Sequence, residues 1–207
     1  MSTIESEVNT ILAKLDQLDK KRETIFQEAR KLNRLSGHGI ALILQKEDYQ
    51  GLIEEGNQIL NTIYQLMNDL SHILSWNSIN SEIEEFSEFI VLASIIESGE
   101  LSTDYGLIPP SIWLSSLADV VGELRRIVLR SIIEEKMDDA LKYHEMMNKI
   151  SFILRGLVYS KTLIPNLRRK IDMVRAVTEK TDSDITNALI FQKVNKKLGN
   201  NQNEESV

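Results

Sequence analysis

The segment Leu117-Ala118-Asp119-Val120-Val121-Gly122-Glu123-Leu124-Arg125-Arg126 decides the fold that we expect for this chain. It lies within residues 112–133, which are apolar on nearly every side of a helix, and a helix of that kind is normally buried. Asp119 and Glu123 interrupt this apolar surface at an i,i+4 spacing, so both carboxylates project from one side of the helix. The segment therefore predicts a protein of packed helices that holds carboxylates near its interior.

Glu85 and Glu88 form a second pair on another nearly apolar helix, residues 83–96. Their i,i+3 spacing places them on one face, and at about 100° per residue Glu85 shares a stripe with the apolar side chains Phe89, Leu92 and Ile96. A carboxylate buried on such a stripe needs compensation. Because Mg²⁺ and Mn²⁺ accept carboxylate oxygens as ligands, we expect a divalent cation between the two helices.

A salt bridge is the structural alternative for these acidic residues. Asp119 has Arg126 within reach along its own helix, and another basic residue across the bundle would serve equally. Without metal the four carboxylates would repel one another, so the pattern predicts that Asp119→Asn raises the melting temperature of the metal-free protein. Gly122 costs the helix about 1 kcal/mol relative to alanine, which we interpret as room for a close approach by a helix, a metal or a phosphate.

The remaining sequence indicates an all-α protein. Its prolines, Pro109, Pro110 and Pro165, fall where helices should begin, and no β-type alternation persists. Thr181-Asp182-Ser183-Asp184 predicts a helix end followed by a new N-cap. We expect one domain over residues 1–198 and a disordered tail over 199–207. Seven helices are predicted, over residues 3–47, 49–75, 78–98, 110–134, 136–158, 164–180 and 183–197.

Composition limits the class of protein further. A chain of 207 residues can bury a substantial core, and the absence of cysteine excludes disulfides and thiol chemistry. The first residues are acidic and lack an apolar run, which does not fit a signal peptide. No stretch is apolar enough to span a membrane. We therefore expect a cytoplasmic protein with no membrane partner.

Basic residues gather locally although the net charge is −7. That total argues against a general coat for nucleic acid, but local stripes matter more than totals. Arg30 and Arg34 lie one helical turn apart and are candidates for guiding a nucleic-acid strand. Arg126 is the candidate for holding a phosphate, because a guanidinium binds it through two parallel hydrogen bonds. Solvated helix faces are the alternative interpretation of each stripe.

Other known chemistries find little support. The glycine-rich loops of nucleotide-binding folds and the G-x-S-x-G motif are absent. A ferritin-like di-iron site needs Glu-x-x-His on two helices, and only Asp69 with His72 comes near it. Glu84-Glu85-x-x-Glu88 spells the first half of the all-α nucleoside-triphosphate pyrophosphohydrolase motif. Its second half has the wrong order and spacing here, so this family stays an alternative.

Four segments of the chain resemble the translin family, specifically the branch of translin-associated factor X. The most specific is the segment 117–126 quoted above, and Glu85-Phe86-Ser87-Glu88-Phe89 is similar to the family's Glu-aromatic-x-Glu-Ala, with Phe89 in place of the small residue. The helix over residues 21–38 and the late helix over 167–175 match as well. The resemblance covers roughly residues 20–180.

This resemblance implies a seven-helix bundle that assembles into a hollow homo-oligomer, often an octamer. It also implies single-stranded RNA, or DNA, as the ligand. Members of the factor X branch are Mg²⁺-dependent endoribonucleases, and their catalytic, metal-binding carboxylates match Glu85, Glu88, Asp119 and Glu123. The translin branch lacks part of this set and binds without cutting. All four positions are filled in this chain, which favours the nuclease branch.

The function that we expect is therefore cleavage of single-stranded RNA by one or two Mg²⁺ or Mn²⁺ ions that generate the attacking hydroxide. Glu88 is a candidate general base, with a pKa raised by apolar neighbours. Trp76 and Trp113 near helix ends predict exposed aromatic surface and hence an oligomer interface. The alternatives are a non-catalytic single-stranded RNA- or DNA-binding scaffold, with the carboxylates paired to arginines, and the pyrophosphohydrolase.

Overall fold

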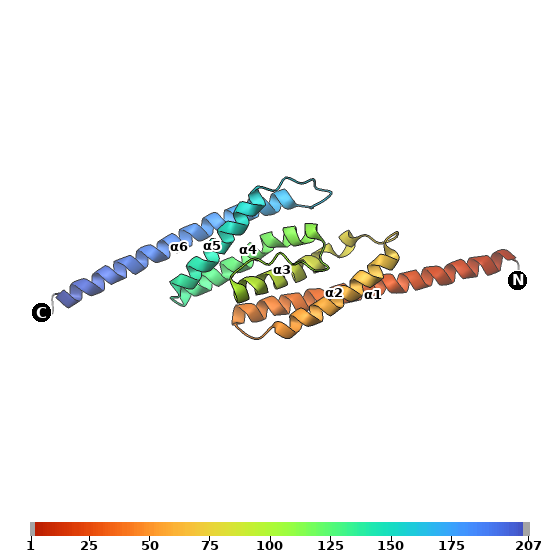
Figure 1. Ribbon diagram of the computed structural model, residues 1–207, viewed down its shortest axis with the longest axis horizontal. Coiled ribbons are helices and arrows are strands. Elements are labelled where there is room, and N and C mark those ends of the chain that lie inside the picture. Colours follow the sequence, from red (N-terminus) through yellow and green to blue (C-terminus); the bar gives the residue numbers. More distant parts are fainter. Residues whose placement is uncertain (1–2, 205–207) are drawn as a thin grey trace. The chain divides into compact units, whose positions relative to one another are not determined.

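The computed structural model describes residues 3–204, with side chains described for residues 4–196. Over that range the chain is helical and contains no strand, so the prediction of an all-α fold is confirmed. Within the described residues no helix is long and apolar enough to cross a bilayer. The described residues form six α-helices and one 3-10 helix (Figure 1): α1 (Thr3–Gln45), α2 (Gln50–Leu70), η1 (Trp76–Ile79), α3 (Asn80–Ser98), α4 (Pro110–Ile133), α5 (Met137–Arg155) and α6 (Leu167–Glu204).

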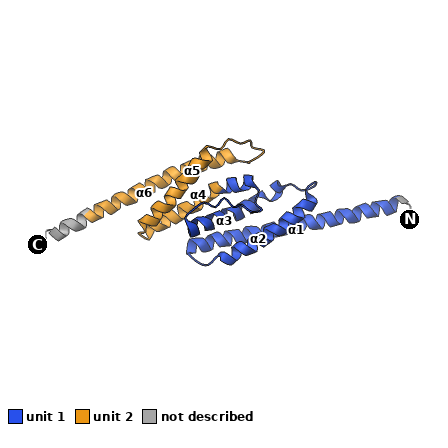
Figure 2. Cartoon of the chain, viewed as in Figure 1, with its two compact units in different colours: residues 1–116 blue, residues 117–207 orange. Residues whose placement is uncertain are grey.

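The chain divides into two compact units, residues 1–116 and residues 117–207 (Figure 2). The division falls inside α4, between Ser116 and Leu117. The first unit contains α1, α2, η1, α3 and the first turns of α4, and the second contains the rest of α4 with α5 and α6. The sequence predicted a single domain over residues 1–198, and that stays a prediction. Each unit is described by itself below.

In the first unit α1 packs against α2 and α3. Buried residues on α1 recur at alternating intervals of four and three, as Ile25, Ala29 and Leu32 show, so one stripe of the helix faces its neighbours. The core is completed by apolar side chains from the other two helices: Leu60, Ile63 and Met67 on α2, and Ile83, Phe86, Phe89 and Leu92 on α3. The predicted burial of residues 83–96 is confirmed for most of their apolar side chains.

Two glycines allow the aromatic side chains of α3 to lie against the backbones of α1 and α2. A Cβ at Gly56 on α2 would overlap the ring of Phe86, and one at Gly39 on α1 would overlap the ring of Phe89. Glycine in the middle of a helix costs about 0.5–1 kcal/mol relative to alanine. Here that cost is offset by the burial of two large rings, which are completely shielded from solvent.

In the second unit α5 packs against α6. The buried positions on α5 include Met147, Ile150 and Leu154, which share one face. Arg125 ties α4 to α6: its Nη1 donates to Oγ1 of Thr181 at 2.6 Å, and its Nη2 lies 2.7 Å from Oδ2 of Asp184. One guanidinium thus satisfies two polar side chains on successive turns of α6.

The predicted break at residues 181–184 is wrong, because α6 runs unbroken from Leu167 to Glu204. The hydroxyls that signalled a cap donate to carbonyls four residues earlier in the same helix. Thr181 donates to Val177 at 2.7 Å and Ser183 to Glu179 at 3.3 Å. The seven predicted helices therefore become six α-helices in the described residues. Residues 199–204 of the predicted tail belong to α6, and residues 205–207 lie outside the described residues.

The start of α4 and the end of α3 lie where the sequence predicted them. α4 begins at Pro110, as its proline predicted. α3 ends at Ser98 and is capped by Gly99, whose φ of 74° is left-handed and whose N–H donates to the carbonyl of Ile95 at 3.0 Å. α6 begins two residues after Pro165 rather than at it, and Asn166 between them has a φ of 60°.

Candidate metal and nucleic-acid site

Glu85 and Glu88 lie half-buried on α3, between side chains that are fully buried. Phe86, Ser87 and Phe89 have no or almost no exposed surface. The hydroxyl of Ser87 is hydrogen-bonded to that of Ser116 at 2.7 Å, so even the polar residue between the two carboxylates has a buried partner. Both carboxylates therefore stand beside buried side chains of α3.

Two residues of α1 lie against the carboxylate of Glu85. The amide Nδ2 of Asn33 donates to its Oε2. A Cβ built on Gly37, one turn further along α1, would lie 3.1 Å from Oε1, so the glycine leaves room for this oxygen. Asn33 and Gly37 therefore fix where the carboxylate of Glu85 sits. Neither residue was predicted from the sequence as part of the site.

Asp119 and Glu123 lie half-buried on α4, in the second unit. Their neighbours Val120, Val121 and Leu124 are buried, so this pair also stands on an apolar helix. A Cβ built on Gly122 would have no neighbouring heavy atom within 4 Å among the described residues. The close helix packing that we considered for this glycine is therefore not found there.

Each of these two carboxylates has a cationic partner. Nζ of Lys170 on α6 lies 2.6 Å from Oδ2 of Asp119, and only 18% of the lysine and 29% of the aspartate side chain is exposed. Nη1 of Arg126 lies 3.1 Å from Oε2 of Glu123, but 66% of that arginine is exposed. The structural alternative of a salt bridge is thus realised for Asp119, with Lys170 rather than Arg126 as the partner. In the sequence, Lys170 stands out only as part of the late helix over residues 167–175.

Burial raises the pKa of Glu123 above its ordinary range. The charge of Arg126 and its hydrogen bond act in the opposite direction and are the smaller effects. Desolvation disfavours the ionised form of a carboxyl group, which is the physical cause of the shift. Glu123 therefore takes up a proton more readily than an exposed glutamate. The sequence suggested Glu88 as the general base, and this stays a prediction.

The donor set of both pairs suits Mg²⁺ or Mn²⁺, because it consists of carboxylate oxygens only. Glu85 and Glu88 belong to the first unit, whereas Asp119 and Glu123 belong to the second. Among the residues that the structure describes, no three His, Cys, Asp or Glu side chains form a group that could hold a metal ion. A metal at these four residues stays a prediction.

The predicted nucleic-acid-binding arginines are all exposed. Arg30 and Arg34 lie one turn apart on α1, and Arg34 directly follows Asn33, the partner of Glu85. Nη2 of Arg30 lies 3.3 Å from Oε1 of Glu23, an exposed pair of a kind that contributes little to stability. In the first unit a basic edge of α1 therefore borders the carboxylate of Glu85.

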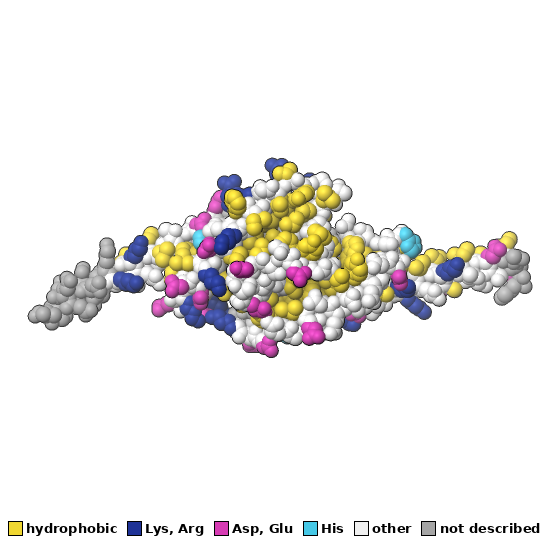
Figure 3. Space-filling model, viewed as in Figure 1, with side chains coloured by type: hydrophobic (Ala, Val, Ile, Leu, Met, Phe, Trp, Pro, Cys, Tyr) yellow, Lys and Arg dark blue, Asp and Glu magenta, His cyan; other side chains and the backbone are white. Residues whose placement is uncertain are grey.

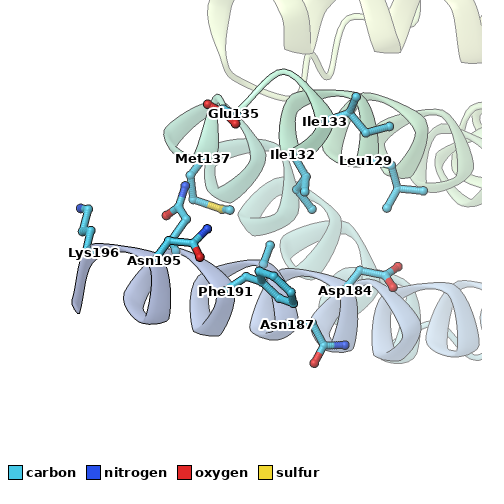
Figure 4. A pocket seen from close by; sticks show the side chains of 12 residues that line it. Leu129, Ile132, Ile133, Glu135, Met137, Asp184, Asn187, Phe191, Asn195 and Lys196 are labelled. Carbon is cyan, nitrogen blue, oxygen red and sulfur yellow. The ribbon is translucent and has the colours of Figure 1, made fainter. Parts of the chain in front are cut away.

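A groove of about 790 Å³ lies elsewhere in the second unit, between the end of α4 and α6 (Figure 4). Its apolar wall comes from three helices, with Ile132 and Ile133 on α4, Met137 on α5 and Phe191 on α6. Asp184, which pairs with Arg125, also lines it. None of the site residues predicted from the sequence lines this groove.

The fold and the two carboxylate pairs define an all-α protein that carries acidic residues on buried helices. No family model matches the chain. An uncharacterised protein of Methanocaldococcus jannaschii is 28% identical over 182 residues, which cover 86% of this chain and 81% of that protein.

Several solved structures are also similar to this chain. AfC3PO is 28% identical, with a TM-score of 0.70 over 90% of this chain and 98% of that one. Its complex with duplex RNA gives a TM-score of 0.69 over 89% and 97%. NeC3PO without ligand is 17% identical and has a TM-score of 0.77 over 87% and 96%, a likeness that concerns the fold alone. These are structures of the translin family, and this chain is similar to them in sequence and in fold.

Proposed function

We propose that this protein is a metal-dependent endoribonuclease of the translin family, in the branch of translin-associated factor X. The observation that carries the proposal is the presence of four half-buried carboxylates, Glu85, Glu88, Asp119 and Glu123, on two helices that also bury large apolar side chains beside them. Partial burial of a carboxylate costs free energy unless a hydrogen bond, a counter-ion or a metal ion compensates it. The likeness to AfC3PO, which forms a complex with duplex RNA, supports RNA as the substrate.

The four carboxylates would hold Mg²⁺ or Mn²⁺, which supplies Lewis acidity toward the scissile phosphate. The chain's own residues prepare the site. Asn33 and Gly37 fix the carboxylate of Glu85, and Lys170 does the same for Asp119. Arg126 is exposed and only weakly held by Glu123, so its guanidinium can exchange the carboxylate for a phosphate group.

RNA would be held along the exposed arginines of α1. Arg30 and Arg34 lie one turn apart and border Glu85, a spacing that suits contacts to the phosphate backbone. We propose single-stranded RNA as the substrate and a closed homo-oligomer, of eight copies, as the active form. A hollow oligomer would admit a single strand and exclude wider RNA.

A non-catalytic RNA-binding scaffold is the second candidate, and a specific observation favours it. Asp119 already has Lys170 as a partly buried counter-ion, and Glu123 has Arg126. Pairs of this kind can compensate burial without any metal. In that case the arginines of α1 would bind RNA, and the carboxylates would stabilise the helices.

A cleavage assay separates the two candidates. End-labelled single-stranded and duplex RNA of the same sequence are incubated with the protein in Mg²⁺, in Mn²⁺ and in excess EDTA. We expect cleavage of the single strand that requires either metal and stops in EDTA. Glu88→Gln should abolish it, whereas Glu54→Gln, at an exposed position on α2, should not. Binding without cleavage in all conditions would favour the scaffold, and faster loss of nucleoside triphosphates than of RNA would favour a pyrophosphohydrolase.

A further inference from the structure

The first part of α1 extends beyond its neighbours in the first unit. Lys21 of α1 forms an ion pair of 2.6 Å with Asp69, which lies one residue before the end of α2. Residues 4–17, which precede Lys21 on α1, are all exposed. Large apolar side chains nevertheless follow this part of the helix, as Figure 3 shows. Ile4, Val8, Ile11 and Leu15 are between 46% and 71% exposed.

These apolar residues have the spacing of a coiled-coil seam. Positions 4, 8, 11, 15 and 18 alternate intervals of four and three, which is the a and d pattern of a heptad repeat. The same register continues at positions 25, 29 and 32, where Ile25, Ala29 and Leu32 are completely buried by the rest of the unit. One stripe of α1 is therefore buried in its later part and exposed in its first part. A heptad stripe of this kind is stable when a second helix covers it.

The charges of this first part of α1 indicate which second helix covers the apolar stripe. Residues 3–13 carry Glu5 and Glu7 and no Lys or Arg. Residues 14–22 carry two aspartates and four basic residues, namely Lys14, Lys20, Lys21 and Arg22. When two such segments pack side by side in opposite directions, with Ile4 of one opposite Leu15 of the other, Glu5 and Glu7 of each helix lie near Lys14 of the second helix. In a parallel pair with the same seam in register, these glutamates would instead lie level with the same glutamates of the second helix, which is unfavourable.

We propose that the first part of α1 binds the same segment of a second copy of this chain in an antiparallel pair. Ile4 then lies opposite the partner's Leu15, and Val8 lies opposite the partner's Ile11, so the contact is two-fold symmetric. About two heptads form a weak contact on their own, and it gains strength when other contacts hold the chains together. The inference deepens the proposed assembly, but it needs neither RNA nor metal.

The chain has no cysteine, so single cysteines report the pairing directly. The two variants are Ile4→Cys and Leu15→Cys in the full chain. Eleven helical residues separate these positions by about 16 Å, whereas a disulfide needs Cα atoms about 4.4–6.8 Å apart. Under mild oxidation we expect neither variant alone to form a linked dimer. An equal mixture should form one that contains one chain of each kind, as a non-reducing gel and mass spectrometry would show.

A second pair of substitutions tests whether the apolar seam, rather than another face of the helix, makes the contact. Adding Val8→Glu with Ile11→Glu to both cysteine variants should reduce the linked dimer at least tenfold. Adding Asn9→Glu with Ala13→Glu brings the same charge to positions outside the seam and should leave the yield within a factor of two. Circular dichroism confirms that all variants keep their helix content.

Each other outcome overturns the proposal. Links within each single variant would show a parallel pair, and no link in the mixture would show that another surface covers this segment. Equal loss of the linked dimer in both glutamate variants would show that the apolar seam is not the contact. RNA cleavage is measured separately, so failure of the proposed nuclease would leave these outcomes unchanged.

Discussion

At the scale of single residues, the partners of the carboxylates change what a substitution should do. The sequence predicted mutual repulsion and hence a higher melting temperature for Asp119→Asn without metal. The structure instead pairs Asp119 with the mostly buried Lys170 at 2.6 Å. Removing one member of such a pair leaves a poorly solvated charge, so the expected sign is reversed.

We therefore expect Asp119→Asn to lower the free energy of unfolding by about 1–2 kcal/mol in EDTA. Cleavage of RNA should fall by about a hundredfold or more, because charge at a metal site is typically worth that much. Urea denaturation and the cleavage assay measure the two effects. Glu54→Gln on the exposed face of α2 is the control and should change stability by less than about 0.5 kcal/mol. Native cleavage by Asp119→Asn would make Asp119 a purely structural residue.

The raised pKa of Glu123 predicts a pH dependence. A carboxyl whose pKa is higher in the folded than in the unfolded protein stabilises the fold fully below the unfolded pKa, and this contribution is lost as the pH rises through the folded pKa. Near neutral pH the ionised Glu123 therefore costs stability. We expect Glu123→Gln to melt at a higher temperature than the native protein at pH 7 in EDTA, with a difference that shrinks toward pH 4. Lower stability of the variant at pH 7 would mean that the pair with Arg126 outweighs burial.

The sequence could predict the carboxylates but not what they touch. Spacing within one helix places Glu85 with Glu88 and Asp119 with Glu123, and the structure agrees that both pairs are half-buried on apolar helices. Asn33, in contrast, is 52 residues from Glu85, and Lys170 is 51 residues from Asp119. Contacts over such separations depend on how whole helices pack. No local pattern in a single sequence distinguishes these two residues from their polar neighbours.

At the scale of helices, glycine positions decide how closely α2 and α3 approach. A Cβ at Gly56 would overlap the ring of Phe86, whereas a Cβ at Gly51 on the same helix meets nothing within 4 Å among the described residues. We expect Gly56→Ala to lower the free energy of unfolding by about 1–3 kcal/mol, because overpacking forces a buried ring to move. Gly51→Ala is the matched control and should raise it by about 0.5 kcal/mol. Urea denaturation of both variants measures the difference.

Helices were predictable from apolar periodicity and prolines, but two inferences from local chemistry were wrong. The cap predicted at residues 181–184 was not found, because Thr181 and Ser183 donate within α6 itself. Trp76 and Trp113 were expected to be exposed. They are half-buried, with ring centroids 5.9 Å from Tyr64 and 6.2 Å from Tyr105 respectively. Exposed apolar side chains lie instead on the first part of α1. Their heptad spacing can be read from the sequence, but only the structure shows that no neighbouring helix covers this part of α1 among the described residues.

At the scale of the whole molecule, the net charge of −7 opposes binding to a polyanion. Any affinity for RNA must then come from a few local cations, which counterion release makes measurable. For single strands the logarithm of the binding constant falls with the logarithm of salt concentration, with a slope of about −0.7 for each phosphate that is neutralised. Arg30 and Arg34 together should therefore account for about 1.4 of that slope.

We expect Arg30→Gln with Arg34→Gln to weaken binding of single-stranded RNA uniformly across sequences and to reduce the slope by about 1.4. Fluorescence anisotropy between 50 and 300 mM KCl, in EDTA to prevent cleavage, gives both quantities. Lys193→Gln with Lys196→Gln on α6 is the control, because it removes the same charge from exposed positions outside the basic edge of α1. If the control variant changes the slope equally, the protein senses only its total charge, and the α1 arginines are not a binding surface. If neither variant changes it, RNA is held through other residues, and the basic edge beside Glu85 has no part in recognition.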